Sequence, residues 1–422
     1  MRKSFVEFLP IYVLTFIWLL TFSLYFWNPF HLPDIRTFTW VVLLTGISMI
    51  YIGYFSGIAL SSGFSFQIKV TVPNRSDFPF PVKSLKRLLF IFSTISLIGV
   101  LGRIYIVMEE IGGIEKFILD PAFTRQFIIQ VKTGEESVNL FAFKIFSYMR
   151  SFMFACIVVG GILYTIPKCK LISIYPLIVA FIAAVLDFQR GTFIGHYIHW
   201  LISAFIFVYY QPKFFQKRAF RSILRQIIYF IIIFALFSLF VLLLRFFFKN
   251  PTNLILIVNS FYFYISGNIW ILDKYLVLDP QPLYGLSNFR TIVSWFSALG
   301  LADKSSVLPP HYEFYPIYNT AMNTFTFVRI IYEDFKFPGI VFISYLWGMF
   351  TFISVKAFVR RFSFVRVGIV VIMTFSFFWS FYTFNLIYIT LNIVRLAQLA
   401  VLDYFIKPVT IVHTETLISS NV

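Results

Sequence analysis

Long apolar stretches follow one another along most of the chain, each separated from the next by a short polar segment. A membrane-spanning helix needs about 20 predominantly apolar residues, and about ten stretches reach or approach that length. They are residues 5–27, 38–60, 88–108, 140–166, 171–186, 193–210, 227–248, 338–358, 367–384 and 386–406. The pattern therefore predicts an all-α polytopic integral membrane protein with about 10 to 12 transmembrane helices.

Composition supports this class and excludes a large soluble catalytic domain. Hydrophobic residues make up 59% of the 422 residues and charged residues only 13%, whereas soluble domains carry roughly 25% charged residues. The usual nucleotide-sugar, ATPase and kinase folds are therefore excluded. The first stretch is too long for the apolar core of a signal peptide and no small-residue cleavage site follows it, so we expect a retained anchor.

Charge placement predicts an orientation. The formal net charge is +17, from 35 basic and 18 acidic residues. If each stretch spans, the basic clusters at 69–87, 168–170, 213–225 and 356–366 fall on the side of the N-terminus, and nearly all acids fall on the other side. Cytoplasmic loops are enriched in Lys and Arg. Both termini are thus expected in the cytoplasm, and the excess charge is an insertion signal rather than a sign of nucleic-acid binding.

Two segments on the external side are longer than a turn. Residues 109–139 are acidic and continue after Gly112-Gly113 as an amphipathic loop. Residues 249–337 form a large external, periplasmic loop with short helices. Its apolar part, 254–278, is interpreted as interfacial or re-entrant, because a span there would invert every later loop. The expected division is 1–248 with transmembrane helices 1–7, then this loop, then 338–422 with transmembrane helices 8–10 and a cytoplasmic tail.

Six arginines lie toward the external ends of these spans or just before them. They are Arg103, Arg150, Arg190, Arg245, Arg329 and Arg395. A guanidinium stays charged and donates paired hydrogen bonds to phosphate oxygens, so this set predicts a pyrophosphate clamp. The alternative for each is snorkelling, in which the stem is buried and the head reaches the interface. For Arg190, a simple ion pair with Asp187 is a further alternative.

Glycosyl transfer to a hydroxyl also needs a proton acceptor. The external candidates are His311, Glu333 and Asp334, each of which is alternatively a solvated loop charge. His196 and His199 are assigned to packing or to the lipid interface, and no metal or other cofactor is predicted. External aromatic residues such as Tyr284, Trp295 and Tyr312 either stack on sugars or belong to the interfacial aromatic belt.

The stretch from Tyr318 to Gly339 resembles the region before a late span in the Wzy-type O-antigen and oligosaccharide repeat-unit polymerases. That family has Asn-x-(Tyr/Phe)-Thr, followed by Asp-Phe-Gly-x-x-Gly. The matching residues are Asn323, Phe325, Thr326, Asp334, Phe335 and Gly339, while Lys336 stands where the family usually has Gly. Gly112-Gly113 followed by Arg125, Arg190-Gly191 and Tyr264 to Leu276 are also similar to the family.

This resemblance implies a GT-C-like membrane glycosyltransferase in the bacterial inner membrane, with its active site facing the periplasm. Such polymerases transfer a growing glycan from undecaprenyl pyrophosphate onto another lipid-linked repeat unit without a metal. The implied partners are the donor and acceptor undecaprenyl-pyrophosphate-linked oligosaccharides, the lipid bilayer and a chain-length regulator membrane protein. Further substrate contacts are expected from Arg125, Arg290, Tyr312, Asn323 and Thr326.

Two points stay open at the level of sequence. The related O-antigen ligases carry a His just before the corresponding Asn, but this chain has Met322 there, so that base cannot be carried over. The alternative function is a transporter, or flippase, of lipid-linked oligosaccharide. A transporter should show paired halves and a charged cavity at the midplane, and no internal repeat is visible in this sequence.

Overall fold

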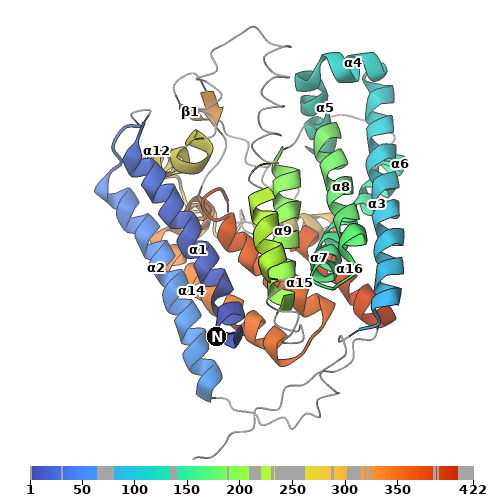
Figure 1. Cartoon of the computed structure of the whole chain (residues 1–422). Coiled ribbons are helices and arrows are strands. Elements are labelled where there is room, and N and C mark those ends of the chain that lie inside the picture. Colours follow the sequence, from blue (N-terminus) through green and yellow to red (C-terminus); the bar gives the residue numbers. More distant parts are fainter. Residues whose placement is uncertain are drawn as a thin grey trace, which may run out of the picture.

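The computed structural model describes residues 2–29, 32–63, 80–133, 140–187, 190–208, 220–229, 232, 262–286, 289–301, 315–317, 320–322, 326–383, 386 and 389–406. Apart from one short hairpin, the elements are helical (Figure 1). The N-terminal ones are α1 (Arg2–Trp27), α2 (Thr37–Gly63), α3 (Val82–Glu110), α4 (Ile114–Leu119), α5 (Pro121–Thr133), α6 (Leu140–Ser151), α7 (Met153–Tyr164), α8 (Lys170–Leu186) and α9 (Arg190–Phe207). The later ones are the π-helical turn η2 (Phe263–Gly267), α12 (Asn268–Leu278), α13 (Arg290–Ala298), β1 (Tyr315–Ile317), β2 (Thr320–Met322), α14 (Phe327–Arg360), α15 (Phe364–Phe378) and α16 (Ile389–Ile406).

Several of these helices are long and apolar enough to cross a membrane. Five qualify by length and composition: Val6–Trp27, Thr37–Ser61, Val82–Glu110, Phe141–Tyr164 and Phe327–Arg360. Three shorter apolar helices, Lys170–Leu186, Gly191–Phe207 and Phe364–Phe378, accompany them. Most of the predicted span 227–248 lies outside the described residues. The chain is thus a helical membrane protein with five candidate spans among the described residues.

The ends of the helices form two distinct layers. The N-terminus of the chain lies at one end of the bundle, and α4, α5, α12 and β1 lie at the other (Figure 1). At the N-terminal end, Lys356 pairs with Glu7 at 3.7 Å, and Lys86 donates to the carbonyl oxygen of Lys168. We call the opposite layer the α12 end.

Close packing of α2 on α14 forms the most extensive contact between two helices in the described part of the chain. Glycines make it possible: a Cβ at Gly53 would overlap the carbonyl oxygen of Tyr345, and one at Gly348 would overlap that of Ile50. Small residues let two backbones approach in a membrane, where packing rather than hydrophobicity drives association. This contact fixes α14, which carries two of the candidate bases.

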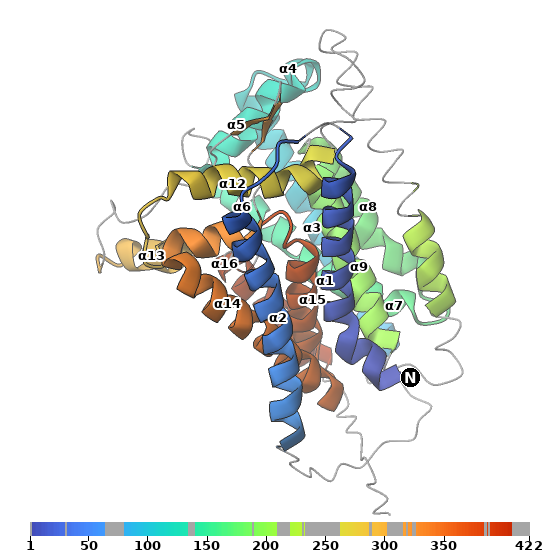
Figure 2. The same cartoon turned by 90° about the vertical axis from the view of Figure 1, so that its left-hand side faces the viewer.

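Helix α12 lies across the α12 end of the bundle rather than along it (Figure 2). Asp273 ties it to the start of α2, because its carboxylate accepts hydrogen bonds from Thr39 Oγ1 (2.6 Å) and from the backbone and side chain of Arg36 (3.0 and 3.2 Å). Burial raises the pKa of Asp273, but the hydrogen bonds from Thr39 and Arg36 outweigh burial and leave it below its usual value. The described part of 254–278 thus lies across the helix bundle, and its place at a membrane interface stays a prediction.

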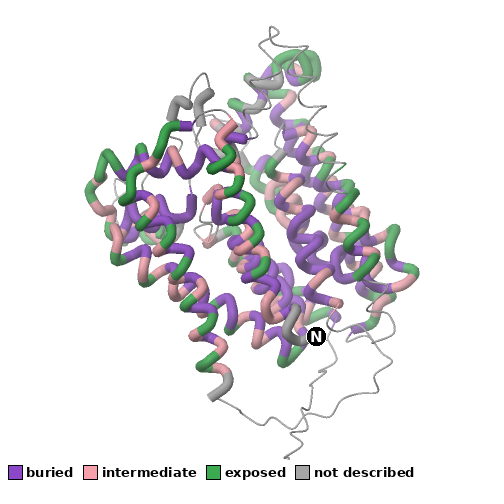
Figure 3. The backbone as a smooth tube through the Cα atoms, turned by 60° about the vertical axis from the view of Figure 1, so that its left-hand side comes forward, coloured by how far each residue is buried: buried purple, intermediate pink, exposed green. Residues whose placement is uncertain are grey.

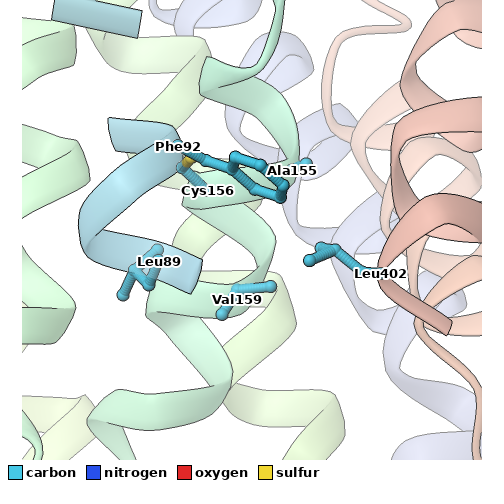
Figure 4. Close-up of a pocket in the computed structure, with 6 residues that line it drawn as sticks. All are labelled: Leu89, Phe92, Ala155, Cys156, Val159 and Leu402. Carbon is cyan, nitrogen blue, oxygen red and sulfur yellow. The ribbon is translucent and has the colours of Figure 1, made fainter. Parts of the chain in front are cut away.

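Helix α7 is the central helix of the bundle. All of its residues from Met153 to Tyr164 are buried, and buried positions concentrate where the helices pack together (Figure 3). One pocket beside α7 is lined by Leu89, Phe92, Ala155, Cys156, Val159 and Leu402 (Figure 4). It is apolar and has no room for a water molecule, so it belongs to the packing rather than to a substrate site.

Candidate functional site

Arg103 and Arg150, from α3 and α6, converge on one carboxylate at the end of α8. Arg103 donates to Asp187 Oδ1, and Arg150 Nη2 lies 2.6 Å from Asp187 Oδ2. Arg103 is 5% exposed and Asp187 is 1% exposed. Two distant predicted members of the clamp are therefore brought together, inside the bundle rather than on its surface.

A glycine on α3 explains why these side chains meet. A Cβ at Gly99 would overlap the backbone nitrogen of Arg150, so only Gly lets the last turn of α6 lie this close to α3. Ser96 adds a hydrogen bond to the Arg150 carbonyl oxygen (3.2 Å). Because Arg103 follows Gly99 by about one helical turn, the two guanidiniums emerge side by side toward Asp187.

Helices α9 and α16 bring a third arginine and two histidines to the same region. The Arg395 guanidinium lies 4.9 Å from the ring centroid of Phe154, and that ring meets His199 edge-on at 5.2 Å. His196 lies one turn before His199, and the charges of Arg395 and Arg150 both act on its ring. We call Arg103, Arg150, Asp187, His196, His199 and Arg395 the arginine cluster.

A hydrogen bond from Gln398 Nε2 to Ser151 Oγ (2.7 Å) joins the two halves of this cluster. Ser151 follows Arg150 directly, and Gln398 lies about one turn after Arg395 on α16. The pairing therefore holds α16 against the break between α6 and α7. Arg150 and Arg395 are kept on neighbouring surfaces of the bundle.

The arginine cluster carries more positive than negative charge. Among the described residues, the ion pairs of Arg103 and Arg150 are both with Asp187. In the same part of the chain, Arg103 Nε, Arg150 Nη1 and both ring nitrogens of His199 are buried without a hydrogen-bond partner. Arg395, whose Nη1 donates to Asn392 Oδ1 at 3.1 Å, adds a third guanidinium to a cluster with one carboxylate. Buried charge is costly unless it is paired, so this excess of positive charge favours a bound anion.

A second group of buried charges begins α14. Arg329, Glu333 and Asp334 are 1%, 7% and 0% exposed, and the Arg329 guanidinium lies 4.4 Å from the ring centroid of Tyr275 on α12. Burial and the charge of Glu333 raise the pKa of Tyr275. We call Arg329, Glu333, Asp334 and Tyr275 the α14 cluster. It contains one guanidinium and two carboxylates, whereas the arginine cluster contains three guanidiniums and one carboxylate.

The chain bends sharply just after the α14 cluster. Lys336 has φ 55° and ψ −154°, a conformation that favours Gly, and interrupts α14. Its ammonium group pairs with Asp279 Oδ1 at 2.8 Å and donates to the carbonyl oxygen of Pro280. The hydrogen bond and the charge of Lys336 lower the pKa of Asp279. Three residues later, a Cβ at Gly339 would overlap the Cβ of Phe335.

The two clusters flank the end of α15. His199 of the arginine cluster packs on Phe375 with ring centroids 3.9 Å apart. A little further along, the Ser380 carbonyl oxygen accepts a hydrogen bond from the backbone nitrogen of Phe327 (2.8 Å), which begins α14. The end of α15 therefore contacts His199 of the arginine cluster, and the chain just after it contacts the first residue of the helix that carries the α14 cluster.

The remaining predicted site residues have different outcomes. Thr326 is buried immediately before α14. Arg125, Arg190 and Arg290 lie in α5, α9 and α13, and their side chains are outside the described residues. Arg245, His311, Tyr312 and Asn323 are outside the described residues altogether. No group of three His, Cys, Asp or Glu side chains among the described residues is placed to hold a metal ion.

Sequence reasoning missed three features of this region. It paired Asp187 with Arg190 only, and it treated His196 and His199 as packing residues apart from any charge. It also left Asp279 without a role opposite Lys336. The order of charges along the chain gives no signal for these pairings, because each depends on which helices become neighbours. The sequence matches no model of a known protein family, no curated protein and no solved structure.

Proposed function

We propose that this protein is a surface-polysaccharide repeat-unit polymerase of the bacterial inner membrane. It would transfer a growing glycan from undecaprenyl pyrophosphate onto another lipid-linked repeat unit at the outer face. The observation that supports the proposal is the excess of buried positive charge in the arginine cluster. This charge lies in a protein that consists largely of apolar helices. A pyrophosphate on a polyprenyl chain combines the anion and the apolar tail that such a site suits.

The proposed chemistry needs no group beyond these side chains and the two lipid-linked substrates. The acceptor hydroxyl oxygen forms a bond to the anomeric carbon of the donor, the bond from that carbon to the pyrophosphate oxygen breaks, and a base takes the hydroxyl proton. Negative charge grows on the departing pyrophosphate, where Arg103, Arg150 and Arg395 stabilise it. Preorganised donors of this kind supply several kcal/mol to a transition state.

The α14 cluster is the proposed source of the base. Glu333 and Asp334 are buried on α14, whose first residue, Phe327, hydrogen-bonds to the chain just after α15. The packing of His199 on Phe375 places the arginine cluster beside the same helix. His311 is the remaining candidate from the sequence. A base must lie within hydrogen-bonding reach of the proton it removes, so the anomeric carbon would sit above the end of α15, between the two clusters.

The bend in α14 supports the resemblance to the Wzy-type polymerases. At the position where those proteins usually have the first Gly of Asp-Phe-Gly-x-x-Gly, this chain has Lys336 with a φ of 55°. At the second Gly, Gly339, no Cβ fits beside Phe335. The motif thus has a physical explanation in this chain, because both positions belong to one bend that only small or strained residues can form.

The remaining expectations are part of this proposal. They are ten spans, a GT-C-like architecture and an N-terminal end that faces the cytoplasm. The α12 end, with the α14 cluster and α12 itself, would then face the periplasm. Basic residues near Lys86, Lys168 and Lys356 gather at the N-terminal end, and that placement agrees with the positive-inside rule.

Reconstitution tests the proposal directly. Purified protein in proteoliposomes is given lipid-linked repeat units, and chain growth is followed by electrophoresis of the released glycan. Arg150→Ala should lose roughly 10²-fold or more in rate, while Arg360→Ala, an exposed arginine at the N-terminal end, should keep the wild-type rate. Movement of the lipid-linked glycan across the bilayer without chain growth would instead identify a transporter.

A further inference from the structure

The exposed side chains of the segment from Tyr284 to Leu301, which contains α13, are largely apolar. We call it the α13 segment. Tyr284 is 81% exposed, Leu299 72% and Leu301 70%. Phe289, Phe296 and Trp295 are also exposed. The inner residues Ile292 and Val293 are apolar as well and half-buried. A short helix that faced water would present polar residues on its outer side, so this segment is not built for water.

A glycine turn gathers these apolar residues into a tip. Gly300 has φ 73°. This conformation lets the backbone nitrogen of Leu301 donate to the Phe296 carbonyl oxygen (2.8 Å), and the backbone nitrogen of Gly300 donates to the Ser297 carbonyl oxygen (3.0 Å). This is the Schellman ending of a helix, in which the residue after the glycine contacts the last turn. Leu301 is thereby brought back beside Phe296, and Leu299 projects next to them.

The charge pattern of this segment points to lipid. Between Asp279 and Asp303 the sequence contains one charged residue, Arg290, and no acidic one. Interfacial helices combine Trp, Phe and Leu with basic residues, and aromatic residues concentrate at the boundary between membrane and water. A sugar-binding surface would require polar partners for the hydroxyl groups beside its aromatic rings, and this tip presents aliphatic side chains instead.

The segment is attached where a membrane boundary must lie. The amide nitrogens of Leu283 and Tyr284 bond to the carbonyl oxygens of Glu333 and Asp334, both at 3.0 Å. Helix α14, a candidate membrane span over Phe327–Arg360, bends at Lys336 just after that point. Helix α13 also contacts α16, and Figure 2 shows it projecting sideways from the bundle, next to the upper part of α14.

We infer that the α13 segment is an interfacial anchor whose apolar tip inserts into the lipid leaflet at the α12 end. The partner is the bilayer itself, through its headgroup and upper acyl region. Insertion would hold the start of α14, and with it the α14 cluster, at a fixed depth relative to the membrane. The inference rests on the membrane class of the protein and does not depend on the proposed polymerase activity.

Depth-dependent quenching tests this inference. Leu299→Cys is labelled with an environment-sensitive thiol fluorophore, since the native Cys156 and Cys169 are buried. The protein is placed in phosphatidylethanolamine and phosphatidylglycerol vesicles, with or without nitroxide-labelled lipid. Glu115→Cys, exposed on α4, serves as the aqueous control, and Phe342→Cys, 62% exposed on the spanning part of α14, serves as the lipid control.

The label at position 299 should lose emission to the nitroxide lipid by roughly twofold, as at position 342, and should resist iodide in the water phase. Quenching by iodide as strong as at position 115 would overturn the inference. Protection from both quenchers would also overturn it, because the tip would then be covered by protein, such as a second copy of this chain. Leu301→Cys repeats the measurement if the first variant fails to fold.

Discussion

The two clusters of buried charge differ in their balance of positive and negative groups. In the arginine cluster, Arg103 and Arg150 share Asp187, and guanidinium nitrogens remain without partners in the described part of the chain. In the α14 cluster, both signs of charge occur on adjacent turns, and backbone hydrogen bonds connect the carboxylate-bearing residues to the chain after α12. Only the first cluster contains more positive than negative groups, three guanidiniums to one carboxylate, whereas the second contains one guanidinium and two carboxylates.

That difference indicates that the two clusters have separate roles. An excess of buried donors destabilises the protein when no anion is bound, and a bound anion reduces that destabilisation. A group without excess positive charge, held by backbone hydrogen bonds, keeps its geometry with or without an anion. We therefore interpret the arginine cluster as the part that binds and the α14 cluster as the part that positions. Both assignments can be broken by substitutions that alter one cluster and spare the other.

The largest effect on chain growth is expected from a double variant of the arginine cluster, which removes one guanidinium together with the carboxylate that it pairs with. Arg103→Gln combined with Asp187→Asn removes one positive and one negative charge, so the net charge is unchanged while the shared ion pair disappears. If the arginines serve the reaction, chain growth should fall by roughly 10²- to 10³-fold. If they serve only to neutralise Asp187, the double variant should polymerise at the wild-type rate.

Fold integrity is the control for this experiment. Thermal unfolding in detergent should place the double variant between wild type and Asp187→Asn, because it replaces both partners of the Arg103 pair and leaves only Arg150 without its carboxylate. Asp187→Asn alone leaves Arg103 and Arg150 without their carboxylate, and its melting temperature should be the lowest of the set. A double variant as unstable as this single one would contradict the ion-pair geometry.

The next effect concerns the bend that positions the α14 cluster. Gly339→Ala places a Cβ against the Cβ of Phe335, and forcing such an overlap costs about 1–3 kcal/mol. Gly191→Ala is the matched control, because a Cβ there meets nothing within 4 Å and Ala favours a helix. Thermal unfolding should separate the two variants. Equal melting temperatures would show that Phe335 can move aside freely.

The two clusters differ in how much of their geometry can be predicted from the sequence. The apolar stretches were open to prediction, because hydrophobicity is a local property, whereas the bend at Lys336 was not, because Lys disfavours a φ of 55°. Convergence of Arg103 and Arg150 on Asp187 was not, since it depends on α3 and α6 touching at Gly99. That all six arginines form one clamp stays a prediction. Arg329 lies with Tyr275 and Arg395 lies with Phe154, and nothing in the order of the chain separates these two arginines.

A smaller effect isolates the strain at Lys336. Lys336→Gly and Lys336→Ala both remove the ammonium contacts with Asp279 and Pro280, but only Gly adopts a φ of 55° with this ψ at little cost. Such conformations cost of order 1–3 kcal/mol for other residues. The Gly variant should therefore unfold at a higher temperature than the Ala variant. An Ala variant of equal or greater stability would remove the strain argument.

The smallest effect is the acid sensitivity of α12, which contacts the α14 cluster through Tyr275 and Arg329. Asp273 has a pKa below its usual value of 3.8, so its ionised form is favoured in the folded protein. Its contribution to stability is fully present above pH 3.8 and is lost as the pH falls through the lowered value. Hydrogen exchange of the α12 amides should accelerate in that range, because protonation weakens the bonds from Arg36 and Thr39.

Asp273→Asn should show fast exchange in α12 at every pH, with no acid transition, because its amide cannot carry the charge that Arg36 pairs with. Asp34 is an exposed carboxylate in the connection between α1 and α2 that also contains Arg36. The control variant Asp34→Asn should behave like wild type. An acid transition that survives in Asp273→Asn would assign the release of α12 to another carboxylate. In that case the attachment of α12 would rest on the α14 cluster, through Tyr275 and Arg329, and the positioning and binding sides would differ less than their charges suggest.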